Sequence, residues 1–448
     1  MNRYRPSIAA LAGVLISSAA HAQVLLPPSA IVTNYDRILI GQEQALESGA
    51  YVARVADATA GWYNPAGLGL VERSIIGASA TGYELAIVDL GAIQTSSGGV
   101  TLVQLPGFFG GVLGSDVTGS DAWRIGFTVT KPTSWSASVN GATAVGIPVT
   151  YSSRVGISTI VPTLSAAWVP WRFLRFGAGL GVAVTSLAQT QVLSVRNSDP
   201  LLAGATLQTA DLTGTTWGAQ ATFGVQWDIS EHFTVGASLR TPTAALIRTG
   251  SLTYQSMATD GTSVNEAYFR DPQAAFAYRI PLAVNFGLAW RGRRFEAEVD
   301  VRYHSAIAEY ALLSSTRLVE TVTTGPGGPP VHTFSPFPGL YYRAAAVWNL
   351  AAGGHYSLDD AWSFHAGIYS DAAPAALTRY NLFRTVNFFG ATLGAKLRGD
   401  HLAGSLGLGF SWGDSNNFPL GEPGDPEAVT TRLSIRSVSL LYAITYTF

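Results

Sequence analysis

The sequence predicts an all-β protein, a transmembrane antiparallel β-barrel of about fourteen strands with an N-terminal lumenal hatch of short helices. Three observations lead there. Only 12 % of the 448 residues are charged although 47 % are apolar, whereas about 25 % of the residues in a soluble domain are charged. Large and small residues alternate with a period of two over long segments. The connections between these segments alternate between short and long.

The first residues are expected to direct export. Arg3 and Arg5 precede the short apolar stretch Ile8–Ile16, and Ala20-His21-Ala22 fits a small-residue cleavage site. Residues 1–22 therefore predict a signal peptide. The bacterial outer membrane is the expected destination for a barrel of this kind. The net charge of −2 gives no sign of nucleic-acid binding.

Residues 23–68 lack the alternation of a strand. Apolar positions within 36–50 favour short helices, so this segment is predicted to be a hatch that sits in the barrel lumen or on the periplasmic side of it. Barrel lumens can be closed by loops or a helix. Residues 69–448 are then the barrel itself.

The predicted barrel strands alternate for ten or more residues, as in Trp217–Trp227 and Leu402–Trp412. Typical globular strands have about five or six residues, whereas a tilted strand needs about nine to eleven to cross a bilayer. Several apolar faces end in Trp, Tyr or Phe, as strands do at the two membrane interfaces. The strands are expected to begin near Ser74, Val100, Ala122, Thr159, Phe173, Thr215, Phe233, Arg279, Phe295, Tyr341, Trp362, Asn387, Leu402 and Leu433.

Connection lengths separate a barrel from a soluble β-sandwich. Short turns are expected at sites such as Pro170–Arg172 and Gly399–Asp400, and long external loops at 133–155, 189–214 and 247–278. Outer-membrane barrels have short periplasmic turns and longer external loops. A sandwich shares the alternation of residues but has no reason to alternate its connections.

The chain ends on the alternating segment Val438–Phe448. This segment resembles the C-terminal strand of outer-membrane proteins, and Phe448 resembles the terminal aromatic that the barrel assembly machinery reads. We therefore expect this machinery as a partner, together with outer-membrane lipid and lipopolysaccharide. The protein is expected to be a monomer.

Residues 64–68 read Asn-Pro-Ala-Gly-Leu, a turn by composition. They resemble the signature of the FadL/TodX family, outer-membrane transporters of long-chain fatty acids and other hydrophobic compounds. The segment Trp362–Pro374 resembles a second segment of that family, with His365 where the family usually has Arg. The resemblance implies a fourteen-stranded barrel with an N-terminal hatch, an inward kink in the third strand and a lateral exit through the wall.

The resemblance also implies roles for particular residues. Asn64, Pro65, Ala66 and Gly67 would form the gate-adjacent turn of the hatch. Pro132 lies at the end of the predicted third strand. Because proline removes a ladder donor, Pro132 is a candidate for the kink, although it could equally end the strand.

One predicted strand, Phe295–Tyr303, is charged along a single face. Alternation points Glu296, Glu298, Asp300 and Arg302 into the lumen. We interpret them as a structural charge ladder, matched by Arg291 or Arg240, in preference to a catalytic pair. Further candidate lumen-facing charges are Arg240 and His365. No metal site, catalytic residue or cofactor is expected, because the histidines lack zinc-motif spacing and no nucleophile motif is present.

The expected function is passive uptake of hydrophobic small molecules, such as long-chain fatty acids or hydrocarbons, through a hatch-gated barrel with a lateral exit. Leaving water is worth about 0.8 kcal/mol per CH₂ group, so such a ligand needs burial and no chemistry. Two alternatives remain open at this point. One is a porin-like channel for polar solutes, and the other is an outer-membrane lipid hydrolase.

Overall fold

The computed structural model describes residues 34–90, 98–101, 105–143, 149–196, 204–374, 386–420 and 429–448. The predicted signal peptide and the first residues of the predicted hatch lie outside these described residues. Among the described residues, no helix is long and apolar enough to cross a bilayer.

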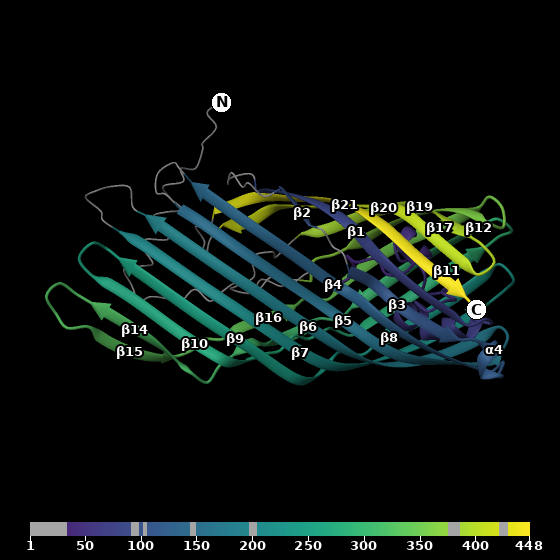
Figure 1. Ribbon diagram of the computed structural model, residues 1–448, viewed down its shortest axis with the longest axis horizontal. Coiled ribbons are helices and arrows are strands. Elements are labelled where there is room, and N and C mark those ends of the chain that lie inside the picture. The colour runs from purple at the N-terminus through teal and green to yellow at the C-terminus, as the bar shows by residue number, and fades with distance from the viewer. Residues whose placement is uncertain are drawn as a thin grey trace, which may run out of the picture.

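The chain forms a closed antiparallel β-barrel of fourteen strands, as predicted (Figure 1). Several strands are interrupted, and their pieces carry separate labels. We count such pieces as one strand because consecutive pieces pair with the same neighbouring strand. In chain order the fourteen are β1 (Ile75–Leu90); β2 (Gly98–Thr101) with β3 (Leu105–Leu113); β4 (Trp123–Thr143); β5 (Val149–Trp171); β6 (Leu174–Arg196); β7 (Ala205–Asp228); β8 (Phe233–Arg240) with β9 (Ala244–Thr259); β10 (Val264–Phe276) with β11 (Ala283–Arg291); β12 (Phe295–His304) with β13 (Ile307–Ser314) and β14 (Leu318–Thr324); β15 (Val331–Pro336) with β16 (Leu340–Ala344) and β17 (Val347–Ser357); β18 (Trp362–Asp371); β19 (Asn387–Arg398); β20 (Leu402–Leu420); and β21 (Val429–Thr447).

The last strand closes the barrel on the first. β21 pairs antiparallel with β1 from Ile75 opposite Thr447 to Leu90 opposite Leu433. Closure gives the backbone N–H and C=O groups of the first and last strands hydrogen-bond partners, which lipid does not offer. The C-terminus lies at the end of the barrel that carries the short turns and the short helix α4 (Ser115–Thr118) (Figure 1). We call this the short-turn end.

The outer face of the wall is apolar and aromatic. Outward side chains such as Leu180, Phe223 and Leu393 are exposed. Aromatic rings gather near the short-turn end, where Trp123 stacks on Trp168 with ring centroids 6.2 Å apart. A surface of this kind suits lipid and explains why the sequence carries so few charges.

The expectation of long external loops is wrong for most of the residues concerned. β4 continues to Thr143, β5 begins at Val149, and β9 and β10 occupy most of residues 247–278. These extensions pair residue by residue, for example Thr150 with Ser194. Polar residues occupy both faces there, which removes the period-two signal although the ladder of hydrogen bonds continues.

Residues 34–70, which we call the lumenal segment, contain the helical elements α2 (Glu43–Leu46), α3 (Ala60–Tyr63) and η2 (Pro65–Leu70). All three are short, and most of their side chains are buried. The 3₁₀-helix η2 lies against the inner face of β5, β6 and β7.

Deleting Phe448 is expected to lower the amount of membrane-assembled barrel severalfold. Its backbone N–H donates to the Ser74 carbonyl at 3.0 Å, and Arg73 donates to its carbonyl, so both groups help to close β21 on the start of β1. Its ring meets Tyr446 edge to face at 5.1 Å. Heat-modifiable migration on a gel measures assembly, and Phe448→Tyr, which keeps the ring, is the control. Equal assembly of the deletion and the control would contradict this role.

Candidate functional site

The lumenal segment packs tightly against glycines on the inner face of the wall. A Cβ atom at Gly224 on β7 would collide with the Asn64 side chain, and one at Gly177 on β6 would collide with the backbone of Pro65 and Ala66. These two positions therefore need glycine so that the turn can approach the strands. The fit places the Asn-Pro-Ala-Gly turn directly on the inside of the wall.

Asn64 fixes this turn through three hydrogen bonds. Its Oδ1 accepts from the Ala66 N–H at 3.2 Å, which caps η2, and Pro65 occupies the first helical position. Its Nδ2 donates to the carbonyls of Val52 at 2.8 Å and Val225 at 2.9 Å. One side chain thus joins two parts of the lumenal segment to strand β7. Gly67 packs against the Val55 carbonyl with no room for a side chain.

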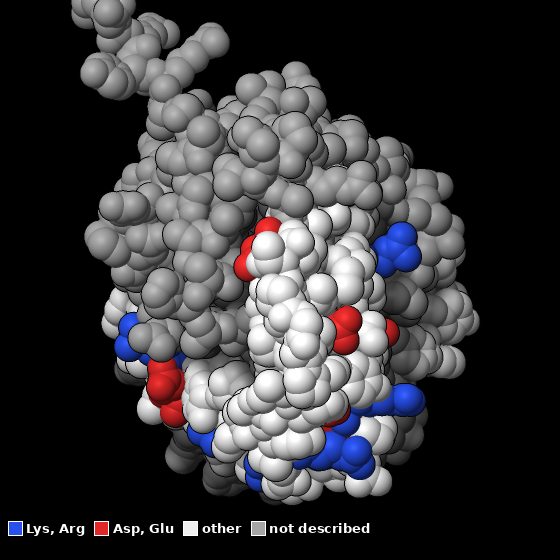
Figure 2. Space-filling view, turned by 90° about the vertical axis from the view of Figure 1, so that its left-hand side faces the viewer, with Lys and Arg blue, Asp and Glu red and all other residues white. Residues whose placement is uncertain are grey.

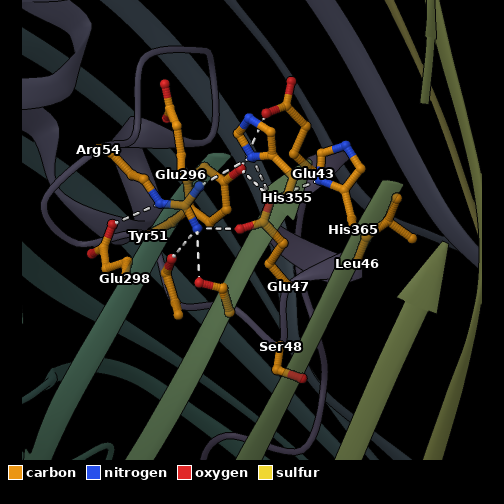
Figure 3. A network of polar contacts seen from close by, with 12 residues as sticks. Glu43, Leu46, Glu47, Ser48, Tyr51, Arg54, Glu296, Glu298, His355 and His365 are labelled. Carbon is orange, nitrogen blue, oxygen red and sulfur yellow. Dashed lines mark hydrogen bonds and ion pairs between the residues drawn. The ribbon is translucent and has the colours of Figure 1, made fainter. Parts of the chain in front are cut away.

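A buried ionic network joins the lumenal segment to the wall (Figure 3). It lies near the short-turn end, because Glu298 is close to the start of β12. Arg54 bonds Glu47 within the lumenal segment and reaches Glu298 on β12, where Nε lies 3.2 Å from Oε2. The side chains of Arg54, Glu47 and Glu298 are almost completely buried. The guanidinium also stacks on the Tyr51 ring, 4.0 Å from its centroid. Buried charges must be paired in this way to be tolerated.

The charged face of β12 bonds the backbone of the lumenal segment. Glu298 accepts from the Ala53 N–H at 2.6 Å, and Asp300 accepts from the Tyr51 N–H at 3.0 Å. Arg302 donates to the Gly49 carbonyl at 2.6 Å. Three of the four charges on this face thus hold the lumenal segment against the wall.

The other predicted lumenal charges are arranged differently. Glu296 pairs with Arg291 at 3.2 Å, one of the two partners suggested by the sequence. Arg240 does not reach the acidic side chains of β12. It lies 3.5 Å from the centroid of the Trp62 ring and donates to the Trp62 carbonyl at 2.7 Å. His365 on β18 bonds Glu47 at 2.6 Å.

One side of the lumen away from the short-turn end carries a cluster of buried apolar and aromatic residues. They come from β5, β6, β7, β9, β10, β13, β14 and β16 and from the residues just after β10, and they include Phe269, Phe276, Leu312, Leu313 and Leu340. Phe337 stacks on Phe269 with ring centroids 4.7 Å apart. The outward view of this end shows charged side chains only singly or in small groups among the described residues (Figure 2).

Pro132 lies within strand β4 and not at its end. Thr130 pairs with Val161 and Thr133 pairs with Thr159, so Lys131 and Pro132 together face a single residue, Ile160. This is a one-residue bulge, which bends a strand and interrupts its ladder. β4 is the third of the fourteen barrel strands, as the sequence predicts.

A groove of about 720 Å³ runs along the wall beside this bulge. Its lining includes outward, exposed residues such as Leu164 and Leu180, and also the buried Thr128 and Gln220. Thr128 lies against Gly61 of the lumenal segment. The groove on the lipid-facing surface therefore lies over a part of the wall whose inner side contacts the lumenal segment. Thr241 and Pro242, between β8 and β9, complete its edge.

Comparisons with known proteins were made by family model, by curated sequence and by structure. No family model matches, and no curated protein matches. The structure is similar to that of a Pseudomonas aeruginosa FadL homologue, with a TM-score of 0.61 at 14 % identity over 93 % of this chain and all of the other. The Pseudomonas putida toluene transporter TodX gives a TM-score of 0.59 at 14 % identity over 93 % and 100 % of the two chains. The CymD monoaromatic hydrocarbon channel gives 0.55 at 14 % identity over 91 % and 97 %.

The chain has the FadL/TodX fold. The fold resemblance predicted from Asn64–Leu68 and Trp362–Pro374 is thereby confirmed for nearly the whole chain. At 14 % identity the similarity establishes architecture, and the roles of individual residues rest on the contacts described above.

Sequence reasoning missed the partners that this FadL-type barrel uses inside its lumen. Arg54, Glu47 and Tyr51 come from a segment without periodicity, and their partners lie more than 240 positions away along the chain. The positions of prolines in the sequence mark where the wall is bulged or interrupted. Prolines 132, 162, 242 and 281 fall at or beside breaks in neighbouring strands.

Proposed function

We propose that this barrel lies in the bacterial outer membrane and takes up hydrophobic small molecules passively. The observation that carries the proposal is the groove beside Pro132, because it lies on the lipid-facing surface and one of its lining residues, Thr128, also contacts the lumenal segment. The named similar structures, a FadL homologue, a toluene transporter and a monoaromatic hydrocarbon channel, support the class of cargo.

The distribution of polarity supports a route with a lateral exit. An apolar ligand gains about 0.8 kcal/mol for each CH₂ group that it buries, so the apolar cluster in the lumen favours its entry. The ionic network around Arg54 opposes passage straight to the short-turn end, because an apolar ligand cannot replace the partners of buried charges. The groove beside Pro132 offers an apolar way out before that network is reached.

In this proposal the lumenal segment is the hatch. Its turn at Asn64–Gly67 packs on the inner side of β6 and β7, and Gly61 packs against Thr128, which lines the groove. A shift of the segment away from Thr128 would open the groove to the lumen. The assembly machinery is the expected partner during insertion, and a monomer is the expected state.

The porin-like alternative needs a water-filled lumen. Among the described residues, the lumenal segment and the apolar cluster fill much of the lumen. A hydrolase would need a nucleophile hydrogen-bonded to a general base, and His304 and Ser305 are adjacent in the sequence. His304 bonds Asp36 at 3.0 Å, and Ser305 follows it beyond the end of β12, with its N–H on the Leu282 carbonyl. Nε2 of His304 is thus engaged by Asp36 and not by Ser305.

Deleting Pro132 tests the lateral exit. The deletion restores one-to-one pairing between β4 and β5 and is expected to close the groove. Uptake of a radiolabelled long-chain fatty acid and of toluene into cells or proteoliposomes should fall to near background, while glucose entry stays at background throughout. The control deletes Gly82 at the one-residue register shift of β1, which lies away from the groove.

Both variants should give the same heat-modifiable barrel. Uptake by the Pro132 deletion equal to that of the Gly82 deletion would overturn the lateral exit. Glucose entry through the unaltered protein would instead favour the porin-like channel.

A further inference from the structure

Two histidines from adjacent strands converge on one carboxylate of the lumenal segment. His355 on β17 and His365 on β18 stand directly opposite each other in the strand register. Their Nδ1 atoms lie 3.0 Å and 2.6 Å from the same oxygen, Oε1 of Glu47. The three ligand atoms lie within 4.8 Å of one another.

We propose that Glu47, His355 and His365 form a binding site for Zn²⁺ that clips the lumenal segment to the wall. Imidazole and carboxylate are ligands that Zn²⁺ accepts, at about 2.0 to 2.2 Å, which separates neighbouring ligands by about 3.3 Å in a tetrahedron. The nitrogen–oxygen distances here are shorter than that by less than 1 Å. A small outward shift of the side chains therefore accommodates the ion.

The surroundings of the triad match those of a metal site. His365 uses its other nitrogen, Nε2, for a 2.8 Å hydrogen bond with the Ser363 hydroxyl, which fixes the ring. Such outer hydrogen bonds orient histidine ligands. The Tyr51 hydroxyl donates to Glu47 at 3.0 Å and to Glu43 at 3.1 Å, so it holds the Glu47 carboxylate in place (Figure 3). Three protein ligands leave the fourth tetrahedral position to water.

The charge balance leaves room for a cation. Lys396 pairs with Glu43, and Arg291 pairs with Glu296. Arg54 is shared by Glu47 and Glu298. Arg54 Nη1 also lies 3.4 Å from His355 Nδ1. A Zn²⁺ ion on that histidine nitrogen would repel the guanidinium, so Nη1 would turn away from the imidazole ring. The bonds of Arg54 to the two carboxylates can be kept.

Access and consequence follow from where the triad lies. His365 and Glu47 are fully buried, whereas His355 retains 14 % side-chain exposure near the short-turn end. An ion entering beside His355 would cross-link Glu47, which directly follows α2, to β17 and β18. Zn²⁺ would thus strengthen the docking of the lumenal segment, whatever the cargo of the barrel is.

The test is metal titration of the full chain, purified in detergent and stripped with a chelator. Co²⁺ should give the intense visible absorption of a tetrahedral site at one ion per chain, and Zn²⁺ should displace it. His355→Gln and His365→Gln keep an N–H donor toward Glu47 but remove a ligand. Each should weaken binding by more than about 100-fold, because even outer-sphere changes cost about 10- to 100-fold.

The matched control is His332→Gln. His332 forms an exposed pair with Glu320 at 2.8 Å but has no second histidine, so affinity should not change. Heat-modifiable migration checks that every variant is folded. Absence of a stoichiometric tetrahedral Co²⁺ band in the unaltered chain would overturn the proposal without recourse to any variant. Equal affinities of the His365→Gln and His332→Gln proteins would overturn it as well.

Discussion

Replacing Arg54 with alanine is expected to release the lumenal segment from the wall and to destabilise the protein by about 3–5 kcal/mol. The substitution leaves Glu47 and Glu298 buried without their shared guanidinium. It also removes the stacking on Tyr51. Breaking a buried ion pair costs more than the pair contributes, because an uncompensated charge remains in the interior.

Urea unfolding in lipid vesicles measures the free energy of unfolding. Limited proteolysis measures the release of residues 34–70 from the wall. Arg291→Ala is the matched control, since it breaks an ion pair whose two side chains are 44 % and 27 % exposed. Such a pair contributes only about 0–1 kcal/mol. Equal stability and equal protease resistance of the two variants would show that the network does not hold the segment.

A disulfide between the lumenal segment and the wall is expected to abolish uptake. The hydroxyls of Ser48 and Thr392 lie 2.9 Å apart and are both buried, and Thr392 belongs to β19. Two sulfur atoms at these positions need to approach to about 2.05 Å, a small adjustment. The chain has no cysteine of its own, so Ser48→Cys with Thr392→Cys can form only this internal bond.

The wall could be predicted because its signal is local. Alternation in segments such as Trp217–Trp227 depends only on which face of a strand meets lipid, so strand number and direction follow from the sequence. The full length of the strands could not be predicted. In the parts of β5 and β6 farthest from the short-turn end, polar residues interrupt the alternation, and Thr150 opposite Ser194 resembles loop sequence.

The candidate site could be predicted only in part. Alternation alone places Glu298, Asp300 and Arg302 in the lumen, but not the segment that meets them. His355 and His365 become neighbours through the pairing of β17 with β18, which sequence spacing does not reveal. For Pro132 the sequence allowed two interpretations, the end of a strand or a kink within it. The pairing register of β4 with β5 places it in a bulge.

The central claim is that cargo passes only when the lumenal segment moves. The most direct measurement is uptake of radiolabelled fatty acid by the Ser48→Cys, Thr392→Cys protein in one preparation, first oxidised and then reduced, with each single-cysteine variant as a control. We predict background uptake when the disulfide is formed, recovery to the level of the single variants after reduction, and no redox effect in those variants. Full uptake by a quantitatively cross-linked protein would contradict the account.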